Sequence, residues 1–143
     1  LGPDWLIFDD FDDVPNYLLR KEARRLFEIA HAPQINAFRL YMWGDEQYFP
    51  QLNNNFDPAY KSLWAWQPKK RDIYIDQSQR HGTVLGVGDN WGLDTPLCLL
   101  HKSWHPATID DKIAKYNAIG IPMSHPFQIA GGEPVPLPEF AHE

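Results

Sequence analysis

One cysteine and two histidines lie within eight residues of each other, in the pattern Cys98-x2-His101-x3-His105, and His125 follows 20 residues later. Thiolate and imidazole are the ligands that zinc prefers in proteins, so a zinc-stabilised module is one hypothesis. Two observations weigh against it. His105 precedes a proline, which disfavours a helix that would bring the two histidines to one side. Leucines flank Cys98, which favours a buried thiol, so we expect no bound metal and no cofactor.

Patterns for covalent or acid–base catalysis are weaker. Ser124 precedes His125 directly, but the chain has no Gly-x-Ser-x-Gly motif. A catalytic carboxylate pair needs one member in an apolar pocket, and the paired acids lie in segments typical of turns and helix caps. These pairs are Asp9/Asp10, Asp12/Asp13, Asp45/Glu46 and Asp110/Asp111. The glycine-rich segment 82–92 lacks a Gly-Lys-Ser/Thr motif and favours a hairpin over a phosphate loop. The sequence therefore assigns no catalytic residue.

Trp64, Trp66 and Trp91 offer flat apolar surfaces, and Asp89 and Asn90 lie beside the last of them. A shared tryptophan face would suit a soluble enzyme or a carbohydrate-binding module, and this is the alternative function. The bases at 69–71 follow Trp66 and are also typical of nucleic-acid or headgroup contacts. The chain as a whole carries a net charge of −6, however, so we expect no nucleic-acid partner.

Length and composition limit the elements that can position these residues. A chain of 143 residues fits a single domain over 1–143, and 43% hydrophobic with 22% charged residues is typical of a globular protein. Thirteen prolines restrict long regular elements. A single cysteine excludes an internal disulfide, and no apolar run is long enough to cross a membrane.

The spacing of apolar residues predicts a helix over residues 16–31, capped by Asp13, with Pro15 in its first turn and Pro33 beyond its end. A group of bases lies largely off the apolar face and is expected to be solvated: Arg20, Lys21, Arg24 and Arg25.

A second helix is predicted after Thr108. The pair Thr108 and Asp111 has the spacing of a capping box, and Gly120 followed by Pro122 should end the helix. Ile109, which begins the helix, shares an apolar face with Ile113 and Tyr116.

Strands are predicted where apolar residues alternate or β-branched residues gather, at 36–42, 71–77, 83–87 and 97–100. A short helix that ends at Gly44 is an alternative for the first segment, and an apolar core segment is an alternative for the last. Turns are predicted at 44–46, 53–58 and 88–90. The expected fold class is therefore α+β, with a small antiparallel sheet or meander, two helices and extended N- and C-terminal arms.

The arms flank a core at 15–121. Residues 1–14 form an acidic N-terminal arm, and residues 122–143 form a proline-rich, extended C-terminal arm. We expect this C-terminal arm to bury its apolar residues against another protein, so that deletion of residues 131–143 leaves the core folded. Aromatic residues dominate the centres of interfaces, and a proline-rich segment loses little entropy on binding. The partner-binding candidates are Trp64, Trp66, Phe127, Pro134, Pro136, Pro138 and Phe140.

The run Trp104-x3-Thr108-x3-Lys112-x7-Gly120-Ile121-x5-Phe127 resembles the tryptophan–short helix–glycine–aromatic run of a small accessory subunit of mitochondrial NADH dehydrogenase, over 24 residues. That family continues into a membrane-spanning helix, whereas this sequence continues into glycines and prolines. The resemblance implies a non-catalytic accessory subunit of a large multiprotein complex of the respiratory chain. It further implies a mitochondrial location, peripheral to a membrane complex, with other protein subunits as partners.

Overall fold

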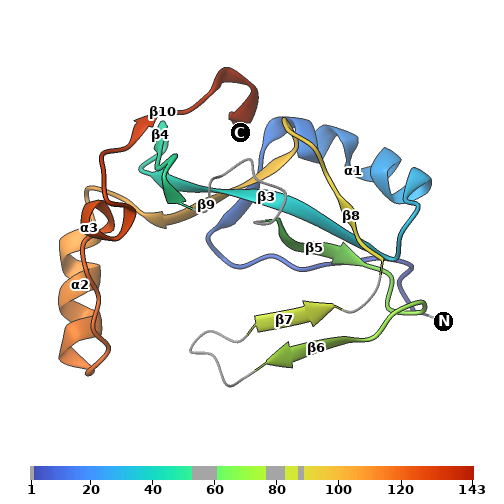
Figure 1. Ribbon diagram of the computed structural model, residues 1–143, viewed down its shortest axis with the longest axis horizontal. Coiled ribbons are helices and arrows are strands. Elements are labelled where there is room, and N and C mark those ends of the chain that lie inside the picture. The colour runs from blue at the N-terminus through green and yellow to red at the C-terminus, as the bar shows by residue number, and fades with distance from the viewer. Residues whose placement is uncertain (1, 53–60, 77–82, 87–88) are drawn as a thin grey trace.

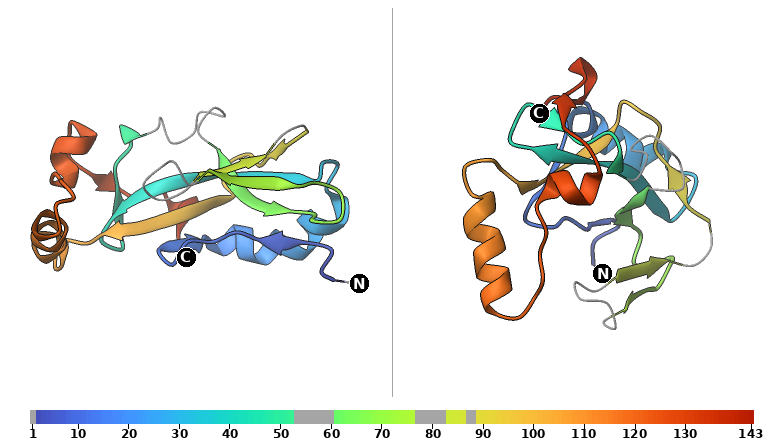
Figure 2. Two further views of the ribbon diagram at one scale, coloured as in Figure 1. Left: turned by 90° about the horizontal axis from the view of Figure 1, so that it is seen from below. Right: turned by 60° about the vertical axis from the view of Figure 1, so that its left-hand side comes forward.

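A computed structural model describes residues 2–52, 61–76, 83–86 and 89–143. The turn predicted at 53–58 lies outside these residues, as do parts of the glycine-rich segment and of the turn predicted at 88–90. In Figure 1 an elongated, twisted sheet runs across the molecule, and Figure 2 shows α1 (Tyr17–Ile29) along one side of it. At the end of the sheet away from α1 lie α2 (Ile109–Ala118) and α3 (Pro126–Ala130). The α+β class is confirmed.

The main sheet has eight strands around β3 (Gln34–Trp43). Antiparallel to β3 lie β4 (Gln47–Tyr48) and β5 (Ser62–Trp66), whereas β8 (Trp91–Gly92) and β9 (Cys98–Trp104) run parallel to it. The sheet is therefore mixed, because the chain enters β9 from the same end as β3. A separate antiparallel pair joins β6 (Ile73–Asp76) and β7 (Thr83–Gly86), where two of the strands were predicted.

Three short strands extend the main sheet. The N-terminal segment contributes β1 (Leu6–Ile7), antiparallel to β5, and β2 (Asp13–Pro15), antiparallel to β9. The C-terminal segment contributes β10 (Val135–Pro136), antiparallel to β4. Both segments predicted to be free arms thus pair with the sheet of their own chain.

Two apolar clusters form the core. In β3, Ile35 and Ala37 belong to one cluster, and Leu40 and Met42 belong to the other. Successive side chains of a strand point to opposite faces, so this alternation places the clusters on the two sides of β3. The first cluster also contains Leu19, Leu26, Trp64, Ala65, Leu93 and Leu99. The second also contains Phe38, Tyr48, Cys98, Leu100, Leu137 and Ala141.

The start of α1 differs from the prediction. Its N-cap is Asn16, whose Oδ1 accepts a hydrogen bond from the Leu19 backbone amide at 2.9 Å. The Nδ2 of Asn16 also donates to the carbonyl oxygens of Pro96 at 2.8 Å and Phe140 at 3.1 Å. Asp13 is not the cap, since it lies in β2. The buried Asn16 side chain therefore joins the start of α1 to the tail of the chain.

The second predicted helix is present as α2, and Gly120 lies just beyond it at φ +78°. The predicted capping box is wrong, because the Thr108 side chain makes no capping hydrogen bond. The helix is held to the sheet by Lys112, whose Nζ donates to the carbonyl and hydroxyl oxygens of Ser103, both at 2.7 Å.

In the described part of the chain, no helix is long and apolar enough to span a bilayer.

The C-terminal segment is not an isolated extended arm. Leu137 and Ala141 are buried in the second cluster, and Ala141 lies in the short 3-10 helix η3 (Glu139–Ala141). Leu137 lies between two prolines that lack an N–H, and its own amide donates to the Glu46 carbonyl at 2.8 Å. The Tyr17 amide donates to the His142 carbonyl at 2.9 Å. The prolines hold an extended path, but that path follows the surface of the same chain.

Candidate functional site

A group of ionisable side chains meets where β2, β9 and β3 run side by side. We call it the charged cluster, and it consists of Asp12, Asp13, Arg39 and His101. The carboxylate of Asp13 is almost completely buried. Its Oδ1 lies 2.7 Å from His101 Nδ1, and its Oδ2 accepts from Arg39 Nη2 at 2.7 Å. One buried carboxylate thus joins two other strands.

Strand register explains this meeting. Asp13 is directly opposite His101 in the antiparallel pairing of β2 with β9. In the parallel pairing of β9 with β3, Leu99 is opposite Arg39, and His101 is opposite Tyr41. Arg39 and His101 therefore lie diagonally on one face of the sheet, within reach of a carboxylate on the neighbouring strand. Tyr41 contacts the His101 ring edge-on, with ring centroids 5.2 Å apart.

Further acids surround the buried pair. Asp12 places its Oδ1 3.6 Å from His101 Nδ1. Desolvation raises the pKa of Asp9, the carboxylates of Asp13 and Asp10 raise it further, and Arg39 opposes them. Arg39 Nε is buried and has no hydrogen-bond partner in the part of the chain that the structure describes.

The charged cluster is poorly suited to a metal ion. Asp12, Asp13 and His101 offer potential ligand atoms within 4.8 Å of one another. Both oxygens of Asp13 are already engaged, however, and the Arg39 guanidinium places a positive charge beside them. A second cation would have to displace Arg39 from the carboxylate. The chemistry of this donor set therefore favours an ion-pair network.

The four residues considered for zinc do not converge. Cys98 and His101 are three residues apart in β9, so their side chains lie on opposite faces of the sheet. Burial raises the pKa of the Cys98 thiol to about 12. His105 lies beyond the strand, with Nε2 3.9 Å from Asp45 Oδ2. His125 caps α3 by accepting from the Phe127 amide at 3.2 Å.

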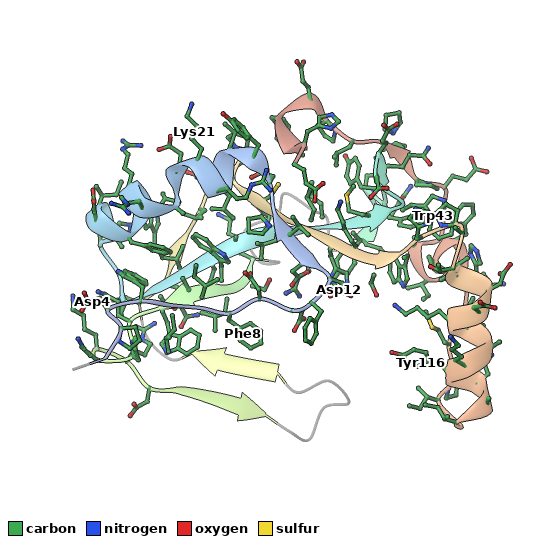
Figure 3. The ribbon with its side chains drawn as sticks, turned by 180° about the vertical axis from the view of Figure 1, so that it is seen from behind. Asp4, Phe8, Asp12, Lys21, Trp43 and Tyr116 are labelled. Carbon is green, nitrogen blue, oxygen red and sulfur yellow. The ribbon has the colours of Figure 1, made fainter. Side chains whose placement is uncertain are left out.

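Beyond the charged cluster, aromatic rings attach α3 to the end of the sheet. We call this group the aromatic cluster. Trp43 lies 5.5 Å from His125 and 5.2 Å from Phe127 between ring centroids. Phe49 lies 5.7 Å from Phe127 and 5.8 Å from Trp104. Figure 3 shows Trp43 at this end of the molecule, next to the helices. Phe127 is therefore fixed on one side by its neighbours and exposed on the other.

Several large apolar side chains of the C-terminal segment are exposed, although the segment itself packs onto the sheet. Phe127 and Ile129 belong to α3, Val135 belongs to β10, and Phe140 belongs to η3. Between 37% and 49% of each of these residues is exposed. We call these four residues the C-terminal surface. Two of them, Phe127 and Phe140, were partner-binding candidates from the sequence. The candidates Pro134 and Pro136 flank Val135, and the candidate Pro138 lies two residues before Phe140.

The tryptophan face does not form as predicted. Trp64 is only 1% exposed and stacks on Phe27, with ring centroids 5.4 Å apart. It therefore belongs to the core and is not available to a partner or a sugar. Trp66 is half-buried at the register position opposite Leu6. Trp91 is also half-buried, and it packs against the first cluster.

An open, shallow depression lies beside α1. It is lined by Asp4, Trp5, Arg24, Phe27, Glu28 and Gln67, none of which belongs to the charged cluster. Trp5 stacks on Phe27 with ring centroids 5.2 Å apart, which fixes the N-terminal segment against the helix. The depression and the charged cluster therefore do not combine into one active site.

Sequence reasoning missed the pairing of Asp13 with Arg39 and treated Asp13 as a helix cap. Arg39 carried a usable signal, because it interrupts the apolar strand between Phe38 and Leu40. A charged residue within a core strand is rarely buried without a partner. Nothing in the order of residues indicated that the partner lay in the acidic N-terminal segment.

A functional proposal for this chain has to start from the arrangement of its own residues. No family model, no curated protein and no solved structure matches the chain.

Proposed function

We propose that this chain is a non-catalytic accessory subunit of a larger multiprotein assembly and that it binds its partners through the C-terminal surface. The observation that carries the proposal is the exposure of four large apolar residues within one segment of the chain: Phe127, Ile129, Val135 and Phe140. Large exposed apolar groups close together are characteristic of protein-interaction sites. The aliphatic and aromatic side chains here have the composition of an interface centre.

The geometry also favours binding by a preformed surface. Phe127 is held against Trp43 and Phe49, so its orientation is already fixed before a partner arrives. Leu137 and Ala141 anchor the same segment in the core. Ordering costs are therefore small, and more of the contact energy contributes to affinity.

A catalytic role receives less support. In the charged cluster, both oxygens of the Asp13 carboxylate are already engaged by Arg39 and His101. The depression beside α1 contains none of these residues. The loss of the shared tryptophan face also removes the basis for a carbohydrate-binding module.

The host we propose is a complex of the mitochondrial respiratory chain, with the subunit peripheral to the membrane. This more specific proposal rests on the resemblance of residues 104–127. The helix α2 lies between Trp104 and Gly120, as that resemblance requires, and so it supports the proposal. Figure 1 shows α2 and α3 together at one end of the molecule, where a partner can reach both.

Native fractionation of the source cells tests the proposal. The chain should migrate far above its own 16.6 kDa, together with the same proteins in each preparation, and it should be enriched in the mitochondrial fraction. Migration as a monomer of 16.6 kDa would contradict an accessory role. Migration in a large complex outside mitochondria would contradict only the respiratory-chain host.

A matched pair of variants tests the surface. Ile129→Ser removes an apolar side chain from the C-terminal surface, and Ile29→Ser removes one of similar exposure from α1. The two residues are 49% and 52% exposed. We expect Ile129→Ser to shift the chain out of the complex and Ile29→Ser to leave it there. Equal behaviour of the two variants would show that the C-terminal surface is not the contact.

A further inference from the structure

The turn between β1 and β2 presents an aromatic side chain to solvent. Phe11 is exposed to 112% of its reference area, whereas the other large apolar residues on the described surface reach at most 70%. Figure 3 shows the segment that leads to it, from Asp4 at one end of the sheet through Phe8 to Asp12 near the middle. Burial of this fully exposed ring against a partner would remove a large apolar area from water and so favour binding.

The turn is anchored on both sides. Before it, the Phe8 amide donates to the Trp64 carbonyl at 2.7 Å. Within it, the Asp13 amide donates to the Asp10 carbonyl at 3.1 Å, and the Lys102 amide donates to the Asp12 carbonyl at 2.6 Å. After the turn, the contacts of the Asp13 carboxylate with Arg39 and His101 fix the backbone in β2. Phe11 is therefore presented on a preordered backbone, and a partner does not have to order it.

The charge around Phe11 is negative. Asp9, Asp10, Asp12 and Asp13 lie within two residues of it, and the Asp13 carboxylate is buried. The Arg39 guanidinium and the His101 ring, which are nearby, are both directed at Asp13. Burial raises the pKa of Asp9, and the neighbouring carboxylates of Asp13 and Asp10 raise it further. A partner that covers Phe11 must therefore offset negative charge at the rim of the contact.

We propose that residues 9–12, the acidic turn, dock Phe11 into an apolar pocket rimmed by lysine or arginine on another protein of the assembly. This inference rests on the proposed accessory function and adds a second contact, distinct from the C-terminal surface. An anionic membrane would repel the turn. A second copy of the chain would offer the exposed bases of α1, but the depression beside them also carries Asp4 and Glu28, whose negative charge would oppose the acidic turn. A different protein is therefore the better match.

Photo-crosslinking in the source cells identifies what Phe11 touches. The full chain would carry p-benzoylphenylalanine in place of Phe11, and the crosslinked peptide would be sequenced. We expect a segment of another subunit that contains apolar residues together with lysine or arginine. A crosslink to a second copy, to lipid or to an acidic surface would overturn the inference, and so would the absence of any crosslink.

Binding affinities of variants for the identified subunit then distinguish the contribution of the Phe11 side chain from that of the acidic charge. Phe11→Ala should weaken binding at least tenfold without loss of folding, since the side chain is wholly exposed. Asp10→Asn should weaken binding less and reduce its salt dependence. Ile7→Ala, a nearby exposed apolar residue on β1, is the control and should have little effect. Equal effects of Phe11→Ala and Ile7→Ala would overturn the inference.

The outcomes distinguish the two proposals. If Ile129→Ser releases the chain from the complex and Phe11→Ala changes nothing, the accessory function stands and the acidic turn has no docking role. A chain that is monomeric in native extracts overturns both.

Discussion

The carboxylate of Asp13 and the imidazole of His101 meet at 2.7 Å although 88 residues separate them in the chain. The second oxygen of the same carboxylate binds Arg39, which is 26 residues away. The side chain of Asp13 is 1% exposed, so it lies in a medium where an ion pair is only weakly screened by water. Asp13 therefore fastens the N-terminal segment to two strands of the sheet.

Substitution Asp13→Ala should cost about 3 kcal/mol of unfolding free energy, because Arg39 and His101 would lose their shared partner while Arg39 stays mostly buried. Urea unfolding followed by tryptophan fluorescence measures the loss. The control is Asp4→Ala, since Asp4 pairs with Lys69 at 3.2 Å but is highly exposed, and there we expect no measurable change. Similar losses for both variants would show that burial of the Asp13 pair contributes little.

The C-terminal segment gives the clearest correction to the sequence prediction. Leu137 is 7% exposed and lies in the second cluster, so Leu137→Ala should cost about 2–3 kcal/mol. Val135→Ala, two residues earlier and more exposed, should cost much less. Deletion of residues 131–143 should abolish cooperative unfolding of the core, because it removes Leu137 and Ala141 together. A cooperative transition of unchanged midpoint in the deleted chain would restore the prediction of a free arm.

Cys98 should be inert in the folded protein. Burial raises its pKa to about 12, so the reactive thiolate is scarce near neutral pH, and the surrounding core excludes reagents. A thiol reagent such as dithiobis-nitrobenzoate should label the native chain only as fast as it unfolds, and should label it at once in concentrated urea. Rapid stoichiometric labelling of the native protein would show that the thiol is accessible.

Asp9 should make stability depend on pH. Its pKa in the folded chain lies above the ordinary value of 3.8, so the folded state binds its proton more tightly than the unfolded state does. Stability attributable to Asp9 therefore decreases as the pH rises from 3.8 through the folded pKa and is constant above it. Asp9→Asn should stabilise the chain slightly at pH 7, and this gain should vanish below pH 3.8. Stability curves of the two proteins at several pH values check the sign, and a gain that persists at the acidic end would contradict it.

The elements that could be predicted from sequence are those whose signals are local. The spacing of Leu19 and Leu26 predicts α1, the alternation through Leu40 and Met42 predicts β3, and Gly120 predicts the end of α2. Each depends on contacts within a few residues and on backbone geometry, which the order of residues specifies directly. The cap of α1 was placed too early because Asp13 and Asn16 both suit an N-cap, and only pairing with β9 decides between them.

Other features depend on contacts between distant residues. The parallel pairing of β9 with β3 and the return of Leu137 to the core are decided by which surfaces fit together. Trp64 shows why the residues of the candidate site were hard to predict from the sequence. A tryptophan next to exposed bases has the same local pattern whether it faces solvent or the core, and here it is buried under Phe27.

Metal addition tests the interpretation of the charged cluster. In the native chain, Arg39 occupies Asp13 Oδ2, so Zn²⁺ should leave the melting temperature unchanged, and purified protein should contain no stoichiometric zinc. Arg39→Met removes the competing cation and leaves Asp12, Asp13 and His101 with ligand atoms within 4.8 Å. This variant should be less stable without metal and should gain stability as Zn²⁺ is added, because an ion that binds only the folded state stabilises it. His101→Gln in the same background supplies the control, since it removes one ligand and should abolish the gain. One zinc ion per native chain, lost on Asp13→Ala, would instead identify the charged cluster as a metal site.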